Sequence, residues 1–483
     1  MSIHKYMRKN ILYFLLICSV PLFAQNNKWT LKACVEHALK HNISVKQSEL
    51  QLESAALSEK DAFGNFLPSL NASATNSWNT GLTQNVTTGV LQTQTTRNSS
   101  YNITAGVPIF NGLRNLRAHQ RAQIEKLAAQ YNLDKMKDDI ALYVANAYLQ
   151  VLLNKENLKV SRSQNEITIE QLERTQELVD AGVLPRGDLL EIEATNASEK
   201  QNMVLAQNAV EVSLISLAQL LLIKDYENFD IADDDYEIFP NELMEKPVRE
   251  IIEAAQESRY EVKLAEKQLE LAEKDLQLAK SEYYPSVTGF FNYNTRETGS
   301  DRIIQGGIDP DNPTYPIGIV EETGQVVVSP NYVYVAEPPL PFFDQLSAND
   351  GISYGVQLNI PIFNGFAARN NVKRREIELK NTSYQLEQAK LDLESNVYQA
   401  FVDVKGAFKA YEAAVVALES QELAYQYAND RFDVGLTNAF DFSQSKMRLD
   451  NAKFELNRTK FEYIFKLKVL ELYFGISPSQ LKL

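Results

Sequence analysis

The pentapeptide Pro108-Ile109-Phe110-Asn111-Gly112 occurs a second time as Pro361-Ile362-Phe363-Asn364-Gly365. At the same spacing of 253 residues, the positions that follow also match, among them Tyr131 with Tyr384, Leu133 with Leu386, Val144 with Val397 and Gly182 with Gly435. Upstream, Pro68-Ser69 corresponds to Pro285-Ser286 at a spacing of 217 residues. An internal repeat of this length predicts two fused copies of one structural unit, and hence an internal two-fold repeat.

The repeat divides the chain into a first unit at 25–224 and a second at 247–475, followed by a tail at 476–483. Between the two units, residues 225–246 form a connector in which nine acidic residues and no basic residue lie between Asp225 and Glu245. Such a charge run with Pro240 near its end predicts a connecting segment and not an element of the core.

The first 24 residues have the pattern of a secretory signal. Basic residues between His4 and Lys9 precede an apolar stretch from Ile11 to Phe23, and Ala24 precedes Gln25. A membrane anchor is less favoured, because the apolar stretch is shorter than the roughly 20 residues of a spanning helix. The formal net charge of −15 predicts a surface that repels nucleic acid.

Two stretches at 112–181 and 365–434 carry uninterrupted helical spacing of apolar residues. At 1.5 Å per residue each helix would be about 105 Å long, so it must pack laterally as in a coiled coil. Shorter helical patterns occupy 31–66, 188–221, 247–284 and 441–474. Two short helices end to end match one long helix in each unit, which predicts a long helical cylinder.

Alternating apolar and polar residues follow each Pro-Ser pair and precede each repeated pentapeptide, which predicts one β-hairpin in each unit. The first hairpin has a Thr/Asn/Gln-rich turn from Gly81 to Ser99, and the second has a long irregular exterior loop at 297–350. Strands of about eleven residues suit a tilted crossing of a bilayer. The residues that we expect to face lipid are Ile103, Val107, Val356, Leu358 and Ile360.

The alternative for these strands is a sandwich, whose apolar faces would pack on each other. Four strands cannot close a barrel alone, and open edges are not tolerated in hydrocarbon. Two chains would give eight strands, too narrow to conduct, whereas three chains would give twelve. The pattern therefore favours a homotrimer in contact with membrane lipid.

The chain resembles the bacterial outer membrane efflux proteins, the TolC-like family. The resemblance covers nearly all of the chain after residue 24 and rests on the order and duplication of three features. These are the Pro-Ile-Phe-Asn-Gly junctions, the Pro-Ser junctions at Pro68 and Pro285, and the motifs that run from Gly182 to Asp188 and from Arg431 through Gly435 to Asp441.

This resemblance implies a mainly α-helical protein with a membrane β-barrel: a long α-helical periplasmic barrel on a twelve-stranded trimeric β-barrel, four strands per chain. It also implies a location in the outer membrane that extends into the periplasm. The implied partners are a periplasmic adaptor (membrane fusion protein) and an inner-membrane transporter of the RND or ABC type.

Few residues point to chemistry. Cys34, His37 and His41 share one helix face and are zinc-type ligands, but three ligands on one helix lack a supporting partner, so a helix start is the plainer interpretation. Ser443-x-x-Lys446 matches a hydrolase fragment without its companion motifs. We therefore expect no enzyme activity, no cofactor and no metal.

Asp188 and Asp441 each lie six residues after the glycine that ends a long helix. The simpler interpretation makes both residues helix N-caps. The functional interpretation places Asp188, Glu191 and Asp441 at the far tip of the cylinder, where three chains would ring a narrow opening with carboxylates. The family often has another acid three residues after Asp441, but this chain has Gln444.

Two functions of different classes follow. The first is a passive outer-membrane exit duct of a tripartite efflux pump or type I secretion system. The second is a structural coiled-coil or adhesin-like protein of the cell envelope without channel activity. The alternating strands favour the duct, since a rod needs no lipid-facing surface.

Overall fold

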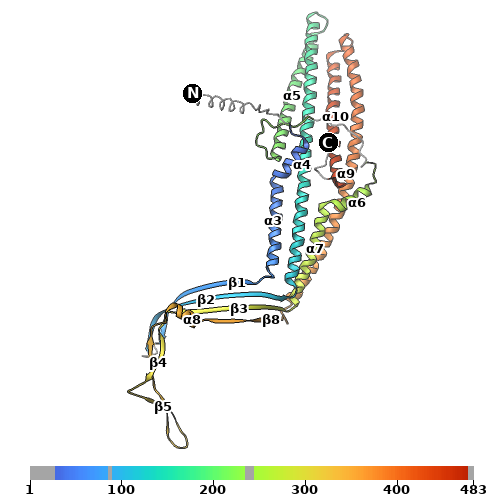
Figure 1. Cartoon of the computed structure of the whole chain (residues 1–483). Helices are drawn as coiled ribbons and strands as arrows, with labels where there is room; N and C mark the ends of the chain where they lie inside the picture. The colour runs from blue at the N-terminus through green and yellow to red at the C-terminus, as the bar shows by residue number, and fades with distance from the viewer. Residues whose placement is uncertain (1–27, 85–89, 234–243, 477–483) are drawn as a thin grey trace, which may run out of the picture. The chain divides into compact units, whose positions relative to one another are not determined.

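The computed structural model describes residues 28–84, 90–233 and 244–476 (Figure 1). The predicted signal at 1–24 lies outside the described residues. Two compact units are present: unit 1 comprises 1–53, 127–267 and 384–483, and unit 2 comprises 54–126 and 268–383. Each unit therefore combines segments from both halves of the sequence.

The long helices are confirmed. They are α4 (Arg114–Asp180) and α9 (Ala367–Asp433), of 67 residues each. The shorter helices are α2 (Leu31–His41), α3 (Ile43–Gly64), α5 (Arg186–Leu220), α6 (Val248–Ser258), α7 (Tyr260–Lys280) and α10 (Ala439–Tyr473), with a 3₁₀ turn η2 at Ser281–Tyr283. Helices α5 and α10 have 35 residues each, so elements of equal type and length recur in the two halves.

The single helices predicted at 31–66 and 247–284 are wrong, because each is broken near its start. Asn42 separates α2 from α3 with an extended ψ of 136°, and its side chain accepts a hydrogen bond from the Ser44 amide at 2.8 Å. Arg259, 217 residues later, separates α6 from α7 with ψ of 133°. An asparagine that bonds its local backbone competes with helix propagation, which apolar spacing alone does not reveal.

The strands form one four-stranded antiparallel sheet in the order β1-β2-β3-β8. Its members are β1 (Ser69–Gln84), β2 (Leu91–Asn111), β3 (Ser286–Thr298) and β8 (Gly351–Asn359). Both predicted hairpins are confirmed. The expected length of about eleven residues is wrong for β1 and β2, which have 16 and 21 residues, because much of the supposed turn at 81–99 is paired strand.

The segment at 297–350 is not irregular as predicted. It contains a two-stranded ribbon of β4 (Arg302–Ile308) and β7 (Tyr332–Glu337), a second ribbon of β5 (Thr314–Ile319) and β6 (Val326–Pro330), and a short helix α8 (Phe342–Ala348). Its Pro, Gly, Asp and Asn residues form the turns between these strands, and the short apolar runs between them form the strands.

The repeated pentapeptides form matching strand-to-helix junctions. Gly112 and Gly365 adopt positive φ angles of 65° and 62°, and the residue after each glycine does the same. A Cβ atom on Gly112 would lie 2.7 Å from the Ser281 carbonyl oxygen, so only glycine fits at that position. Pro108 adjoins a register shift in β2, where a residue without an N–H is tolerated, and Pro361 lies two residues beyond the end of β8.

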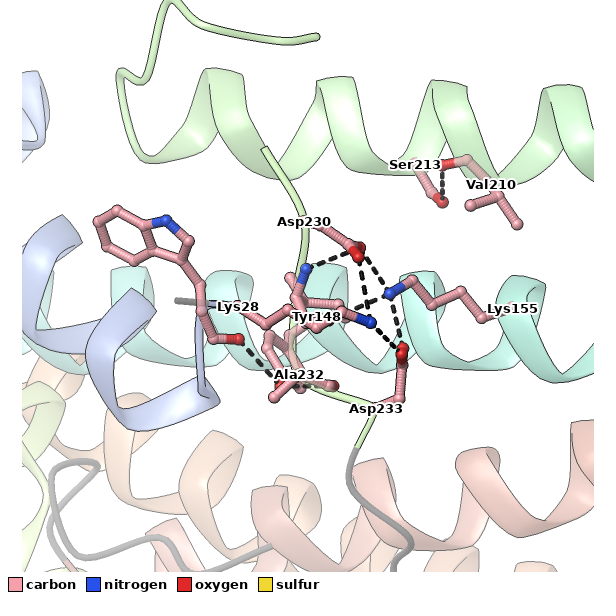
Figure 2. A network of polar contacts seen from close by, with 10 residues as sticks. Lys28, Tyr148, Lys155, Val210, Ser213, Asp230, Ala232 and Asp233 are labelled. Atoms are coloured by element: carbon pink, nitrogen blue, oxygen red, sulfur yellow. Dashed lines mark hydrogen bonds and ion pairs between the residues drawn. The ribbon is translucent and has the colours of Figure 1, made fainter. Parts of the chain in front are cut away.

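The largest core cluster of unit 1 joins α2, α4, the end of α5, the connector and α10. Two connector residues, Phe229 and Ile231, are buried in it, so the prediction that the connector takes no part in the core is wrong for its described first part. Ile231 forms a parallel bridge with Trp29. Figure 2 shows how Lys155 of α4 binds Asp230 at 2.5 Å and Asp233 at 2.6 Å. Lys28 pairs with the same two carboxylates, so two cations neutralise the two acids beside the buried residues.

Candidate functional site

The candidate site in unit 1 contains the two turns that connect α4 to α5 and α9 to α10. Gly182 and Gly435 adopt positive φ angles of 75° and 73°. The amide after each glycine bonds back to the helix at 2.8 Å, from Val183 to Leu178 and from Leu436 to Arg431. This is the glycine stop of the Schellman type, which explains why both long helices end at corresponding positions.

An apolar cluster next to these turns packs the helix pair α4–α5 against the helix pair α9–α10. Ile192 of α5 is buried with Phe432, Ala439 and Phe442 of α9 and α10. The rings of Phe432 and Phe442 stack with their centroids 5.0 Å apart. An ion pair of 3.0 Å between Arg174 and Asp433 joins α4 to α9. The turns are therefore positioned by packing between the halves of the chain.

The interpretation of Asp188 and Asp441 as N-caps is wrong. The caps are Pro185 and Asn438, and each aspartate is the third residue of its helix. Asn438 accepts the amide of Asp441 at 2.8 Å, whereas Asp188 accepts the amide of Ala439, the first residue of α10, at 3.4 Å. Asp188 of α5 thus accepts a hydrogen bond from a backbone amide at the start of α10, which has no partner within its own helix. The spacing from Gly182 does not reveal this contact.

Glu191 lines a cavity of about 650 Å³ between α4, α5 and α10. Gln444, three residues after Asp441, lines the same cavity. Asp188 is half-buried and Asp441 is exposed. The structure therefore brings Asp188 and Glu191 to the side of α5 that faces α10, while Asp441 is exposed on α10.

A buried lysine crosslinks three helices below the turns. The ammonium group of Lys446 donates to Glu199 of α5 at 2.5 Å, to the Gln164 carbonyl of α4 at 2.9 Å, and to the Thr168 hydroxyl. The exposed fractions of the Lys446 and Glu199 side chains are 4% and 13%. In the sequence Lys446 stands out only as the end of Ser443-x-x-Lys446, and no local signal pairs it with Glu199.

Burial also perturbs the groups next to Lys446. Burial raises the pKa of Asp450 to about 6, although the nearby Lys446 ammonium acts in the opposite direction. Burial raises the pKa of Tyr425 to about 12, with further contributions from the Asp450, Asp433 and Glu199 carboxylates. Desolvation is thus the largest cause of both shifts, and charged groups of α5, α9 and α10 add smaller contributions.

The four-stranded sheet of unit 2 has two chemically distinct faces, which its register defines. On what we call the apolar face, the cross-strand rows are Ala72–Ile103–Tyr293–Ile352, Leu70–Ala105–Phe291–Tyr354 and Val107–Gly289–Val356, followed by Val287–Leu358. The polar face carries Asn71–Thr104–Asn292–Ser353 and Ser73–Asn102–Asn294–Gly351. The predicted residues Ile103, Val107, Val356 and Leu358 do share one face, whereas Ile360 lies beyond the end of β8.

Phe290 is the exception on the polar face. It pairs with Gly106 and Gly355, and its ring lies 3.1 Å from the position that a Cβ atom of residue 355 would occupy. The two glycines therefore make room for an aromatic ring on an otherwise polar surface.

The Cys34, His37 and His41 group is part of α2. Cys34 is fully buried in the core, and burial raises the pKa of its thiol to about 12. The ring of His37 packs edge-on against Trp29 at 5.1 Å and lies 4.4 Å from that of His41. Among the described residues, no group of three or more His, Cys, Asp or Glu side chains is arranged to hold a metal ion.

The model of the outer membrane efflux protein family matches residues 34–221 and 251–464. The chain belongs to this family. As an outer membrane efflux protein it shares 24% identity over 338 residues with the outer membrane protein TolC of Vibrio cholerae, a match that spans 69% of this chain and 66%, just under two thirds, of that relative.

Solved structures of outer membrane channels share the fold of this outer membrane efflux protein. VceC of Vibrio cholerae superposes with a TM-score of 0.71 at 15% identity, covering 92% of this chain and 96% of that chain. CmeC of Campylobacter jejuni gives 0.72 at 15% identity, covering 95% and 86%. The open state of MtrE of Neisseria gonorrhoeae gives 0.64 at 17% identity, covering 94% and 91%. Family and fold thus agree with the predicted outer-membrane location and favour a channel over a coiled-coil rod.

Proposed function

We propose that three copies of this chain form a passive exit duct through the outer membrane, which receives substrates from an inner-membrane transporter of the RND or ABC type through a periplasmic adaptor. The observation that carries the proposal is the sheet of unit 2. Its apolar face suits lipid and its polar face suits a water-filled lumen. Strands β1 and β8 are its outer members, and only closure with further copies satisfies their free edges in a membrane.

The helices also present surfaces that suit further copies of the chain. On α9, the side chains of Tyr384, Leu391 and Tyr398 follow one another at intervals of seven residues and are 58%, 56% and 47% exposed. On α3, Ile43 and Leu50 have the same spacing and are 57% and 64% exposed. Apolar residues repeated every seven positions form the contact surface of a coiled coil. In a single chain about half or more of each of these side chains is exposed.

The repeat specifies how these surfaces would meet. Within one chain, the ring centroids of Tyr131 on α4 and Tyr260 on α7 lie 6.1 Å apart. The counterpart of Tyr131, 253 residues on, is Tyr384, and the counterpart of Tyr260, 217 residues earlier, is Ile43. The equivalent contact between copies therefore joins Tyr384 of one copy to Ile43 of the next. Each copy offers both surfaces, so the contact is head-to-tail, and a rotation of one third of a turn per copy would close three copies into a ring.

Disulfide crosslinking tests this assembly. Cysteines introduced by Ile43→Cys and Tyr384→Cys, with Cys34→Ser to remove the native thiol, should join three chains covalently after mild oxidation. The matched control combines Ile43→Cys with Val402→Cys, which lies about 27 Å farther along α9. Covalent dimers as the end product, or equal crosslinking of the control pair, would contradict the trimeric assembly.

The tip carboxylates complete the proposal. Asp188, Glu191 and Asp441 of three copies would surround the opening at the α4–α5 and α9–α10 turns. Carboxylates around a narrow aqueous opening attract cations and repel one another. The proposed closed state is therefore cation-selective. Reversal potentials measured under a salt gradient test it, and a closed state without cation preference would contradict it.

A further inference from the structure

Helix α8 is fixed to the four-stranded sheet by a buried glutamine. Gln345 is 5% exposed, and its amide group donates to the Leu340 carbonyl at 2.7 Å and to the Thr298 carbonyl at 3.1 Å. Its side-chain oxygen accepts the Thr298 amide at 3.0 Å. The Thr295 hydroxyl donates to the Leu346 carbonyl at 2.7 Å. A seven-residue helix is thereby held to the end of β3.

Helix α8 lies on the apolar face of the sheet. Thr295 and Glu297 have the same side-chain direction as Tyr293, because side chains alternate along a strand. On β2, Tyr101 has the direction of Ile103, and its ring contacts that of Phe342 at 6.1 Å. Helix α8 thus covers the apolar face just beyond the row Ala72–Ile103–Tyr293–Ile352.

Under α8 the apolar face becomes polar. Ser99, Thr295 and Glu297 are 5%, 6% and 4% exposed. The Ser99 hydroxyl donates to Glu297 at 2.9 Å, and Arg97 forms an ion pair with the same carboxylate. Without α8, these polar groups would lie on the surface that faces lipid, where polar groups are expensive.

The outer side of α8 is aromatic. Phe343 is 79% exposed and Phe342 is 39% exposed, and their rings lie 5.2 Å apart. The contacts of α8 with Thr295, Thr298 and Tyr101 place it over β3 and β2. A short helix with polar groups inward and aromatic groups outward, at the end of a lipid-facing surface, suits the boundary between headgroups and acyl chains.

We propose that α8 is an interfacial helix that inserts Phe343 into the outer leaflet of the outer membrane and fixes the depth of the barrel. The inference rests on the proposed function, since it requires the apolar face to meet lipid. Below α8, strand β2 runs for ten residues from Tyr101 through Phe110 with every second side chain on the apolar face, and this matches the roughly 9 to 11 residues that cross a bilayer. The outer-leaflet boundary then falls at the level of α8.

Spin labels in reconstituted vesicles test this placement. In the Cys34→Ser protein, labels are attached separately after Phe343→Cys, Tyr354→Cys on the apolar face, Gln357→Cys on the polar face, and Val320→Cys next to β5. Their collision rates with oxygen, which partitions into lipid, and with a water-soluble nickel chelate are then compared. We expect the oxygen-to-nickel ratio at 343 to lie between the high value at 354 and the low value at 320.

Two results at position 343 would overturn the inference. A ratio equal to that at 320 would place α8 in water, and protection from both reagents would show that a neighbouring copy covers Phe343. The labels at 354 and 357 test the proposed function separately. If the labels at 354 and 357 gave the same oxygen-to-nickel ratio, the lipid-facing surface itself would be contradicted. If the ratio at 354 were high and that at 357 low while the label at 343 was exposed to water, only the role of α8 would be contradicted.

Discussion

Replacing Lys446 by methionine should destabilise the helices of unit 1 strongly. The ammonium group is the only cation that is bonded to Glu199 among the interactions of the described residues, and the two side chains are 4% and 13% exposed. Removing one partner of a buried ion pair typically costs about 3–5 kcal/mol, because the remaining charge stays desolvated. The lost bonds to the Gln164 carbonyl and the Thr168 hydroxyl act in the same direction.

The assay is urea unfolding of the detergent-solubilised protein, followed by helical circular dichroism. The double variant Lys446→Met, Glu199→Gln removes the orphaned charge and should recover at least about half of the loss. Lys466→Met is the matched control, since its partner Asp403 is 57% exposed and such a pair contributes less than about 1 kcal/mol. A loss below 1 kcal/mol for Lys446→Met, or purely additive effects in the double variant, would refute the buried pair.

Three further predictions concern the sheet, the buried acid and the tip. Val356→Arg should cost about 2–4 kcal/mol of folding free energy in lipid vesicles while Gln357→Arg is tolerated, and the reverse order would shift the face assignment by one residue. Burial holds the pKa of Asp450 at about 6, above the roughly 3.9 of an unfolded chain, so stability falls as pH rises through this window. Asp450→Asn should therefore stabilise the protein by up to about 3 kcal/mol at pH 7 and by nothing below pH 4, and denaturant midpoints at both pH values check this. Asp188→Asn and Asp441→Asn should each weaken cation selectivity and sensitivity to divalent ions in single-channel reversal potentials, and unchanged selectivity in both variants would leave these residues a structural role only.

The sequence predicts the helices and the hairpins because their signals are periodic and duplicated. The predicted limits of the long helices, 112–181 and 365–434, differ from those of α4 and α9 by only one or two residues. The sequence does not predict the paired parts of β1 and β2 within 81–99. Strands that extend beyond an apolar layer need no apolar face, and the Thr, Asn and Gln residues of this stretch resemble a turn. The helix break at Asn42 is not predicted, because a side chain that bonds to the local backbone leaves the apolar spacing unchanged.

The candidate site was predictable only in part. The two glycines, and likewise Asp188 and Asp441, are visible because they recur at a spacing of 253 residues. The contact between Asp188 and the start of α10 depends on packing between segments 251 residues apart, which no local pattern encodes. The same is true of Lys446 and Glu199, since a buried charge is recognisable only when its partner has been placed. The sequence does not predict helix α8, because the Pro and Gly content of 297–350 indicates an irregular loop.

Single-channel recording from the purified protein in a planar bilayer tests the central claim most directly. Protein fractions with the mass of three chains should produce discrete conductance steps, small and cation-selective in the resting state. Fractions with the mass of one chain should produce none, because one sheet cannot close around a lumen. Stable, correctly folded trimers that insert into the bilayer and conduct no ions would contradict the account.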